Sequence, residues 1–273
     1  MSTGAMVSEA DRLKARLKTM WMAGDYDRFS RYMESGAREF YERLGLAPGC
    51  RVLDVGCGSG QLALMAAKDG LGVTGVDIAS NLVARARARA QAEGLEVRFE
   101  EGDAETLPFE DGRFDAVVSL IGAMFAPQPA LVAGELLRVC VSGGTIAMGN
   151  WTPQGFVGQM FKTISKFIAP SGMPSPVLWG EEAVVRERLG AGLSDLSLTR
   201  RLYPFSYPFP PAEVVEIFRL YYGPANLAFA SLDAEGRERL REELEALWTS
   251  HNRAGTECTT VFAEYLEVVG IRA

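Results

Sequence analysis

Short apolar runs alternate with longer amphipathic segments through the middle of the chain. Five runs of strand length occur at 51–56, 72–77, 96–102, 114–121 and 144–151. Between them, apolar residues recur at helical spacing near 61–69, 80–93 and 129–140. Strands that alternate with helices require right-handed crossovers, and these make neighbouring strands parallel. The pattern therefore predicts an α/β body built on a parallel sheet.

Two amphipathic helices are predicted ahead of this body. Apolar residues recur at helical spacing from Leu13 to Trp21, and Gly24 interrupts the pattern. A second helix carries a wide apolar stripe from Phe29 to Leu44 and stops at Gly45. A stripe of this width predicts that the helix packs on the body of the protein.

The segment after Trp151 departs from simple alternation. It contains an amphipathic stretch from Phe156, an aromatic stretch at 203–209, a charged helix at about 234–252 and a last strand or strands from Thr259. Aromatic-rich insertions of this length often form lids or binding walls. We expect three parts: a helical lead-in (1–45), an α/β core (46–151), and a cap insertion with final strands that complete the same domain (152–273).

The first predicted strand leads directly into three alternate glycines, Gly56, Gly58 and Gly60. Glycine lacks a side chain, so a ligand can lie against bare backbone at these positions. The helix that follows presents unpaired N–H groups at its N-terminus, which suit polar ligand atoms. The sequence therefore predicts a site for a nucleoside with a polar tail.

Two interpretations of this loop compete. The stretch Gly58 to Ala63 fits the dinucleotide pattern G-x-G-x-x-A, and Asp77 ends the next strand at the spacing of a ribose-binding acid. However, Asp54 precedes the glycines, and a carboxylate there would repel a pyrophosphate but attract an ammonium or sulfonium. A third acid, Asp103, follows the third predicted strand. Three acidic strand ends favour a cationic nucleoside.

An ordered set of motifs follows the loop, with Gly-Asp-Ala-Glu-Thr-Leu-Pro-Phe at 102–109, Phe-Asp-Ala-Val at 114–117 and Gly-Gly-Thr at 143–145. With this order, the stretch from Arg51 to Trp151 resembles the class I S-adenosylmethionine-dependent methyltransferases. It is most similar to the small-molecule branch that includes the ubiquinone/menaquinone-biosynthesis enzymes. The resemblance implies a doubly wound, Rossmann-like, mostly parallel seven-stranded sheet with helices on both faces. The helical cap expected after the fifth strand departs from the minimal form of this fold.

The resemblance also implies roles for individual residues toward S-adenosyl-L-methionine. The methionine moiety would lie close to the backbone of the glycine loop. Asp77 would accept hydrogen bonds from the ribose hydroxyls, and Asp103 would accept one from the adenine amine. Leu120 would face the cofactor. The full implied set is Asp54, Gly56, Gly58, Ser59, Gly60, Asp77, Ile78, Asp103, Ala104 and Leu120. The alternative for each aspartate is a helix cap or a turn residue after a strand.

The composition of the chain limits the kinds of molecule that it is expected to bind. The net charge of −7 and the isoelectric point near 5.0 disfavour a nucleic-acid partner. The four cysteines are widely spaced without a C-x-x-C pair, so neither a disulfide framework nor a metal site is indicated. The N-terminus lacks a signal-peptide pattern, and no apolar run reaches membrane-spanning length. We therefore expect a cytoplasmic protein without stable membrane insertion; the oligomeric state is left open.

The wall of an acceptor pocket is expected in the cap. Its candidate members lie at the predicted carboxyl edge of the sheet or on cap helices and are Trp151, Phe156, Met160, Tyr222 and His251. A secondary core made of the same residues is the competing interpretation. His251, the single histidine, is a weak candidate for a general base, and a hydrogen-bonded core histidine is the simpler expectation. The catalytic residues are otherwise unknown.

The function predicted from the sequence is methyl transfer from S-adenosylmethionine to a small-molecule acceptor by in-line displacement. The alternative enzyme class is an oxidoreductase that binds NAD(P) or FAD on the same kind of sheet. The non-enzymatic alternative is a catalytically silent cofactor-binding protein. The sequence does not identify the acceptor, the atom that is methylated or the pathway.

Overall fold

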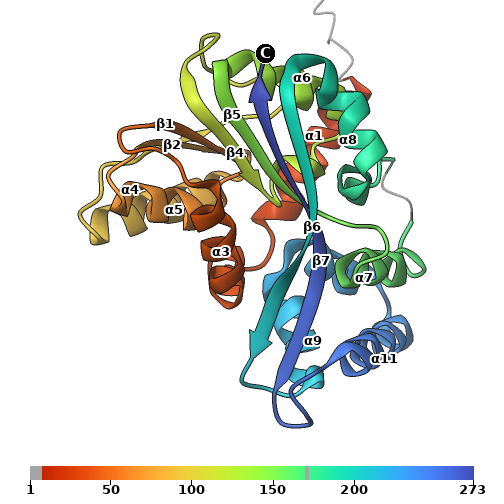
Figure 1. Ribbon diagram of the computed structural model, residues 1–273. Helices are drawn as coiled ribbons and strands as arrows, with labels where there is room; N and C mark the ends of the chain where they lie inside the picture. Colours follow the sequence, from red (N-terminus) through yellow and green to blue (C-terminus); the bar gives the residue numbers. More distant parts are fainter. Residues whose placement is uncertain (1–7, 170–171) are drawn as a thin grey trace, which may run out of the picture.

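The computed structural model describes residues 8–169 and 172–273 (Figure 1). Seven strands form one sheet in the order β3-β2-β1-β4-β5-β7-β6. They are β1 (Arg51–Val55), β2 (Gly72–Asp77), β3 (Arg98–Glu101), β4 (Phe114–Leu120), β5 (Cys140–Trp151), β6 (Leu193–Tyr207) and β7 (Thr259–Arg272). Strands β1 to β5 are parallel, and β7 is antiparallel to both of its neighbours. The predicted mostly parallel, seven-stranded sheet is confirmed.

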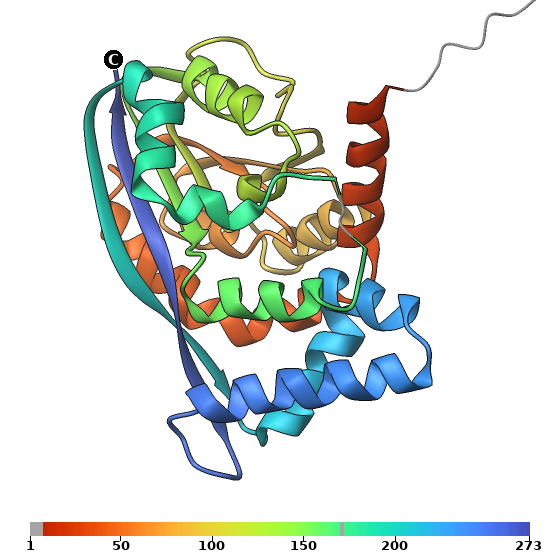
Figure 2. The same ribbon diagram turned by 90° about the vertical axis from the view of Figure 1, so that its right-hand side faces the viewer.

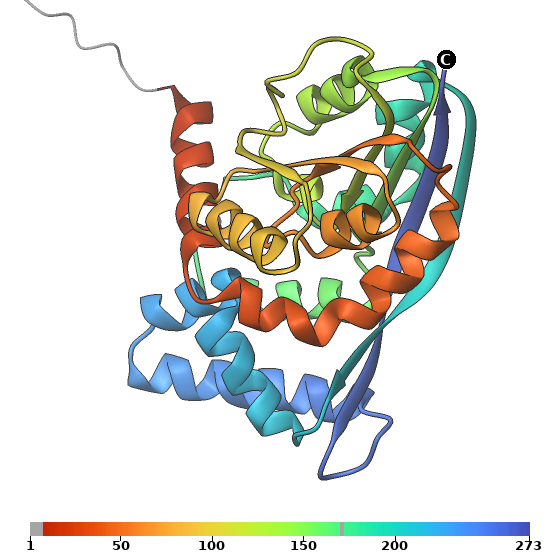
Figure 3. The same cartoon turned by 90° about the vertical axis from the view of Figure 1, so that its left-hand side faces the viewer.

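Helices cover both faces of the sheet. One face carries α3 (Glu34–Leu44), α4 (Gln61–Lys68) and α5 (Ser80–Ala92) (Figure 3). The opposite face carries α6 (Pro129–Val139) and α8 (Glu182–Leu189) (Figure 2). The central strands β1 and β4 are therefore covered from both sides, which explains why most of their residues are buried.

The cap is a separate layer of helices at the end of the sheet where β6 and β7 extend beyond it (Figures 1 and 2). It consists of α7 (Phe156–Ser165), α9 (Pro211–Tyr221), α10 (Gly223–Ser231) and α11 (Ala234–His251). Short 3-10 turns, η3 (Pro176–Gly180) and η4 (Gly190–Gly192), flank α8. The cap is thus interleaved in sequence with the last two strands.

Strand β6 differs from the expectation of an aromatic stretch confined to 203–209. It begins ten residues earlier, at Leu193, and pairs with β7 along its length. Arg200, Arg201 and Pro204 break the apolar alternation that would have indicated a strand. Charges and proline are tolerated there because β6 lies at the edge of the sheet.

The N-terminal helices run along the cap side of the body. Helix α1 (Glu9–Met22) is capped by Ser8, whose side chain accepts from the Asp11 N–H, and it contacts α5 and α10 (Figure 2). The predicted break follows, at Gly24 with φ of 74°. The second predicted helix is divided into α2 (Tyr26–Ser30), the 3-10 turn η1 (Arg31–Met33) and α3. No helix within the described ranges is both long and apolar enough to cross a membrane.

Candidate active site

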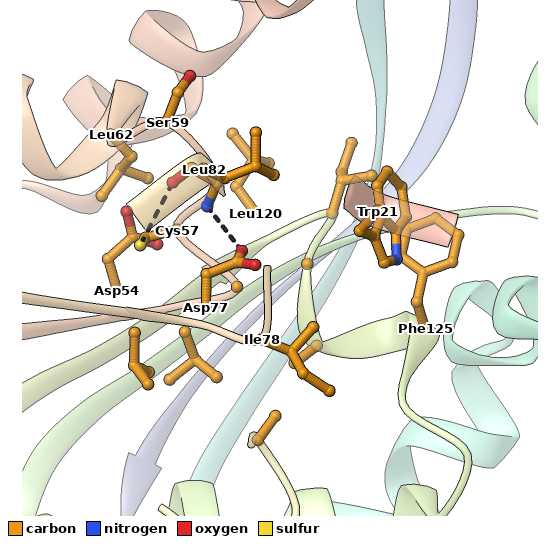
Figure 4. Close-up of a pocket in the computed structure, with 18 of the residues that line it drawn as sticks. Trp21, Asp54, Cys57, Ser59, Leu62, Asp77, Ile78, Leu82, Leu120 and Phe125 are labelled. Carbon is orange, nitrogen blue, oxygen red and sulfur yellow. Dashed lines mark hydrogen bonds between the residues drawn. The ribbon is translucent and has the colours of Figure 1, made fainter. Parts of the chain in front are cut away.

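A cavity lies at the carboxyl ends of β1, β2 and β4, with about 940 Å³ of space counting its open mouth. We call it the larger cavity. Open α/β sheets bind ligands at this edge because the loops after the strands diverge there. Helix α1 contributes Leu17 and Trp21 to the wall, and the turn η2 (Ala123–Phe125) contributes Phe125 (Figure 4).

The glycine loop after β1 forms one wall of the larger cavity. Gly56 has a φ of 71° and lies so close to the loop after β4 that a Cβ would be 2.7 Å from the Gly122 Cα. Gly58 has a φ of 53° and also lines the cavity. Gly60 begins α4 but is absent from the lining; a Cβ there would lie 2.8 Å from the Phe99 ring. Gly60 therefore allows the glycine loop to pack closely against Phe99 of β3.

Asp77 organises the loop from the end of β2. Its Oδ2 accepts from the Gly58 N–H at 2.8 Å (Figure 4), and its Oδ1 accepts from the Ala79 N–H at 2.8 Å. Burial raises the pKa of Asp77, and the two backbone donors oppose that shift. A carboxylate has about four lone-pair sites, so each oxygen keeps capacity for a further donor.

Asp54 is the most unusual group in the larger cavity. Its side chain lines the cavity and is 3 % exposed, and among the described residues its Oδ2 has no hydrogen-bond partner. Burial raises the pKa of Asp54 to about 7, while the Ala63 N–H lowers it and the nearby Asp77 raises it. A buried, unpartnered carboxylate oxygen is costly unless something pairs with it. The site therefore suits a ligand that brings a positive charge to Asp54.

The opposite end of the larger cavity contains Asp103 and Ala104, which follow β3. Asp103 accepts from the Glu105 N–H at 2.9 Å and forms an ion pair with Lys14 of α1 at 2.6 Å. Lys14 also pairs with the buried Glu105 at 2.8 Å. This cation joins α1 to the rim of the cavity.

The remaining residues of the expected cofactor set also line the larger cavity. Ile78 follows β2, Leu120 ends β4, and Ser59 lies in the glycine loop. Ser59 is buried, and its backbone oxygen accepts from the Arg89 side chain at 3.2 Å. The structure thus brings together all of the expected set except Gly60, which lies behind the loop.

A smaller, apolar cavity, with about 300 Å³ of space counting its open mouth, adjoins the larger one. Trp21, Tyr26 and Ile121 line both cavities and mark the junction. Ile121 has a φ of 55°, a conformation that β-branched residues rarely adopt. Such strain recurs at functional sites, and here it occurs where the two cavities meet.

Three of the five expected acceptor-wall residues line the smaller cavity: Trp151, Met160 and Tyr222. The structure does not bring Phe156 and His251 to either of the two cavities. Phe156 packs against Trp248, with ring centroids 4.5 Å apart, and against the His251 ring. His251 Nδ1 lies 3.1 Å from the Leu247 oxygen, so it is occupied within its own helix. Phe156 is therefore buried where α7 packs on α11, and His251 is a half-buried residue that is hydrogen-bonded at the end of α11.

Comparison with known proteins identifies the family. The family model for a methyltransferase domain matches residues 52–144. An uncharacterized protein of Mycobacterium tuberculosis is 39 % identical over 236 residues, which cover 85 % of this chain and 86 % of that protein. The demethylmenaquinone methyltransferase of Thermus thermophilus is 37 % identical over 159 residues, which cover 55 % of this chain and 72 % of that enzyme.

The chain belongs to the methyltransferase family. Among solved structures, the YcgJ protein of Bacillus subtilis is similar to this methyltransferase with a TM-score of 0.60. The two chains are 19 % identical, and the match covers 87 % of this chain and 98 % of that one, so the likeness concerns the fold. The matched family region contains the glycine loop, Asp77, Asp103 and Leu120 but neither α1 nor the cap.

Two residues that shape the cavities of this methyltransferase were not predicted from the sequence. Trp21 lines both cavities and contacts Phe125 at a centroid distance of 4.8 Å and Tyr222 at 5.9 Å. Lys14 pairs with Asp103 and Glu105 across the rim. The sequence offers only one sign of their role: Lys14 and Trp21 lie on a predicted helix that ends just before Gly24. Helical spacing alone does not indicate which face meets a ligand.

Lys14→Met is expected to weaken cofactor binding by this methyltransferase about three- to tenfold. The substitution removes the cation that holds α1 against Asp103, and hydrogen bonds to charged groups contribute about 1.5–3 kcal/mol, less where solvent screens them. Titration calorimetry with S-adenosylhomocysteine provides the measurement. Lys18→Met is the matched control, since Lys18 lies one turn further along α1 and pairs with the exposed Glu101. Equal affinity in the two variants would contradict the role given to Lys14.

Proposed function

We propose that this protein is an S-adenosylmethionine-dependent methyltransferase that acts on a small molecule by in-line displacement. The observation that carries the proposal is the unpartnered Oδ2 of buried Asp54 beside a glycine loop held open by Asp77. S-adenosylmethionine brings both an ammonium and a sulfonium, and a buried carboxylate favours such charges. A pyrophosphate at the glycine loop would meet Asp54 as a like charge, so Asp54 disfavours a dinucleotide.

The residues present fit this cofactor along the length of the larger cavity. We propose that Asp54 and the glycine loop hold the methionine end, and that Asp77 accepts from the ribose hydroxyls with its remaining lone pairs. Asp103 and Ala104 would hold the adenine edge, with Ile78 and Leu120 as apolar contacts. The bound cofactor supplies an activated methyl group on a positively charged sulfur.

The contribution of the chain to catalysis is chiefly positional. Trp21, Tyr26 and Ile121 at the junction would keep a nucleophile from the smaller cavity aligned with the methyl group and exclude water. Alignment of two reactants can lower a barrier by about 7–11 kcal/mol in favourable cases. Within the described residues, no group of histidine, cysteine, aspartate or glutamate has the arrangement of a metal site.

Titration calorimetry separates the candidate functions. We expect S-adenosylmethionine and S-adenosylhomocysteine to bind, and NAD(H) and FAD not to bind. Binding of NAD(H) alone would replace the proposal with an oxidoreductase. Binding of S-adenosylmethionine without formation of S-adenosylhomocysteine across a broad acceptor panel would indicate a catalytically silent protein.

The affinity for S-adenosylmethionine is expected to fall as the pH falls below about 7. Asp54 has a raised pKa of about 7 in the free protein, so it is largely protonated below that pH. A bound ammonium favours the ionised carboxylate and lowers this pKa, so binding at lower pH must release a proton. The expected slope approaches tenfold per pH unit below pH 7 and is flat above it.

Calorimetry between pH 5.5 and 8.5 measures this dependence. Asp54→Asn supplies the control because it keeps the shape of the side chain and removes its titration. We expect weaker and pH-independent binding by that variant. A wild-type affinity that does not change over this range would contradict the pairing of Asp54 with a cationic ligand.

A further inference from the structure

The smaller cavity has no charged lining. Among the described residues that form its wall, every one is aliphatic, aromatic or methionine, and the polar side-chain atoms there belong to tyrosines and tryptophans. The histidine of the chain is held elsewhere by Leu247, and the carboxylates Asp54 and Asp77 line the larger cavity alone. An anionic nucleophile would therefore lack a counter-ion in the smaller cavity.

The two tyrosine hydroxyls in the wall are poorly suited to accept a proton. Burial raises the pKa of Tyr26 and of Tyr222, and for Tyr26 the nearby Asp77 adds to the effect. Both remain neutral phenols at physiological pH. An alcohol or phenol acceptor, which must lose its proton around the time of transfer, would find no base in this wall.

The aromatic rings of the wall surround the junction closely. Tyr222 lies 5.0 Å from Phe29, 5.9 Å from Trp21 and 6.5 Å from Tyr26 between ring centroids. The faces of these rings carry partial negative charge and attract a cation that has lost its water. Ring faces that line this cavity would therefore favour positive charge there, and the wall supplies no carboxylate or histidine as a proton acceptor.

We propose, building on the proposed methyl transfer, that the acceptor is an apolar, uncharged tertiary amine or nitrogen heteroaromatic. Its nitrogen lone pair attacks the methyl carbon, a C–N bond forms, and the C–S bond breaks with its electron pair passing to sulfur. The positive charge moves from sulfur to nitrogen, and no proton has to leave. The reaction yields neutral S-adenosylhomocysteine and a quaternary ammonium or N-methylated ring cation, which the aromatic faces accommodate. The apolar wall also favours the unprotonated, nucleophilic form of the amine.

A matched acceptor panel tests this assignment. Quinoline, isoquinoline and N,N-dimethylaniline supply neutral nitrogen at pH 8, and 1-naphthol and 2-naphthalenethiol supply oxygen and sulfur on similar rings. We expect N-methylated cations from at least one of the nitrogen compounds, without release of a proton, and at least tenfold less turnover of the naphthol and the thiol. Failure of all three nitrogen compounds, or better turnover of the naphthol or thiol, overturns the assignment. Calorimetry with S-adenosylmethionine, performed first, detects a failure of the proposed function itself.

A pair of substitutions at Tyr222 tests the part of the wall that carries the inference. Tyr222→Phe keeps the ring face and removes the hydroxyl, whereas Tyr222→Leu removes the ring. We expect kcat/KM for the nitrogen acceptor to be about tenfold lower in Tyr222→Leu than in Tyr222→Phe, since the π face stabilises the developing cation. Cofactor affinity should match in the two variants, because Tyr222 lines only the smaller cavity of the two. An equal, more than hundredfold loss in both variants would indicate a catalytic hydroxyl and overturn the proposal.

Discussion

Gly58→Val is expected to abolish measurable binding of S-adenosylmethionine, with a loss of more than a hundredfold. Gly58 has a φ of 53°, lies in the wall of the larger cavity and donates its N–H to Asp77. A β-branched side chain disfavours this backbone conformation by about 1–3 kcal/mol, and a relaxed backbone would withdraw the N–H from Asp77. The new methyl groups would also extend from a loop that a ligand must approach closely. Calorimetry and thermal unfolding measure the two effects separately.

Gly70→Val is the matched control for this experiment. Gly70 has a φ of 79° just after α4, and a Cβ there would meet no atom within 4 Å. The valine in this control is therefore expected to strain the backbone to a similar degree, at a position outside the cofactor site. We expect it to lower the unfolding temperature while leaving cofactor affinity intact. Binding by Gly58→Val within threefold of the wild type would exclude the glycine loop from the site.

Asp77→Ala is expected to reduce cofactor affinity about ten- to hundredfold in a protein that still folds. The substitution removes the acceptor proposed for the ribose and also leaves the Gly58 and Ala79 N–H groups without their partner. Loss of a hydrogen bond to a charged group costs about 1.5–3 kcal/mol, which corresponds to this range. Calorimetry on the folded variant provides the measurement.

Asp77→Asn refines the interpretation of that result. The amide keeps one oxygen that can accept, but its NH₂ group faces a backbone donor or a ribose hydroxyl where an oxygen stood. We expect its affinity to lie between those of the wild type and Asp77→Ala. An affinity unchanged in Asp77→Ala would show that the ribose is held elsewhere and that Asp77 serves only the loop.

The α/β body could be predicted because its determinants are local. The run from Arg51 to Val55 is short and β-branched, glycines end it, and apolar helical spacing follows, so strand, loop and helix are each encoded where they occur. The carboxyl ends of parallel strands share one edge of the sheet. This rule alone predicts that Asp54, Asp77 and Asp103, which lie at or just after the ends of three strands, line one cavity.

The cap and the N-terminal helix α1 are placed by contacts that the sequence pattern does not encode. Met160 and Phe156 share the apolar face of α7, yet Met160 lines the smaller cavity while Phe156 packs on Trp248. A helical repeat identifies a buried face without identifying what covers each part of it. Lys14 reaches carboxylates about ninety residues away in sequence, and an isolated lysine on a helix gives no local sign of such a partner.

The position of β7 between β5 and β6 has a consequence for the order of assembly during protein synthesis. β6 leaves the ribosome before β7, although β7 is the strand with which it pairs. At about 5–20 residues per second, the chain between Tyr207 and the end of β7 takes on the order of seconds to make. Throughout that interval the free edge of β5 is available to β6, a pairing that would shut β7 out. Arg200 and Arg201 of β6 form ion pairs with Glu264 and Glu267 of β7, so these two charge pairs of β6 can form only with the strand that is made last.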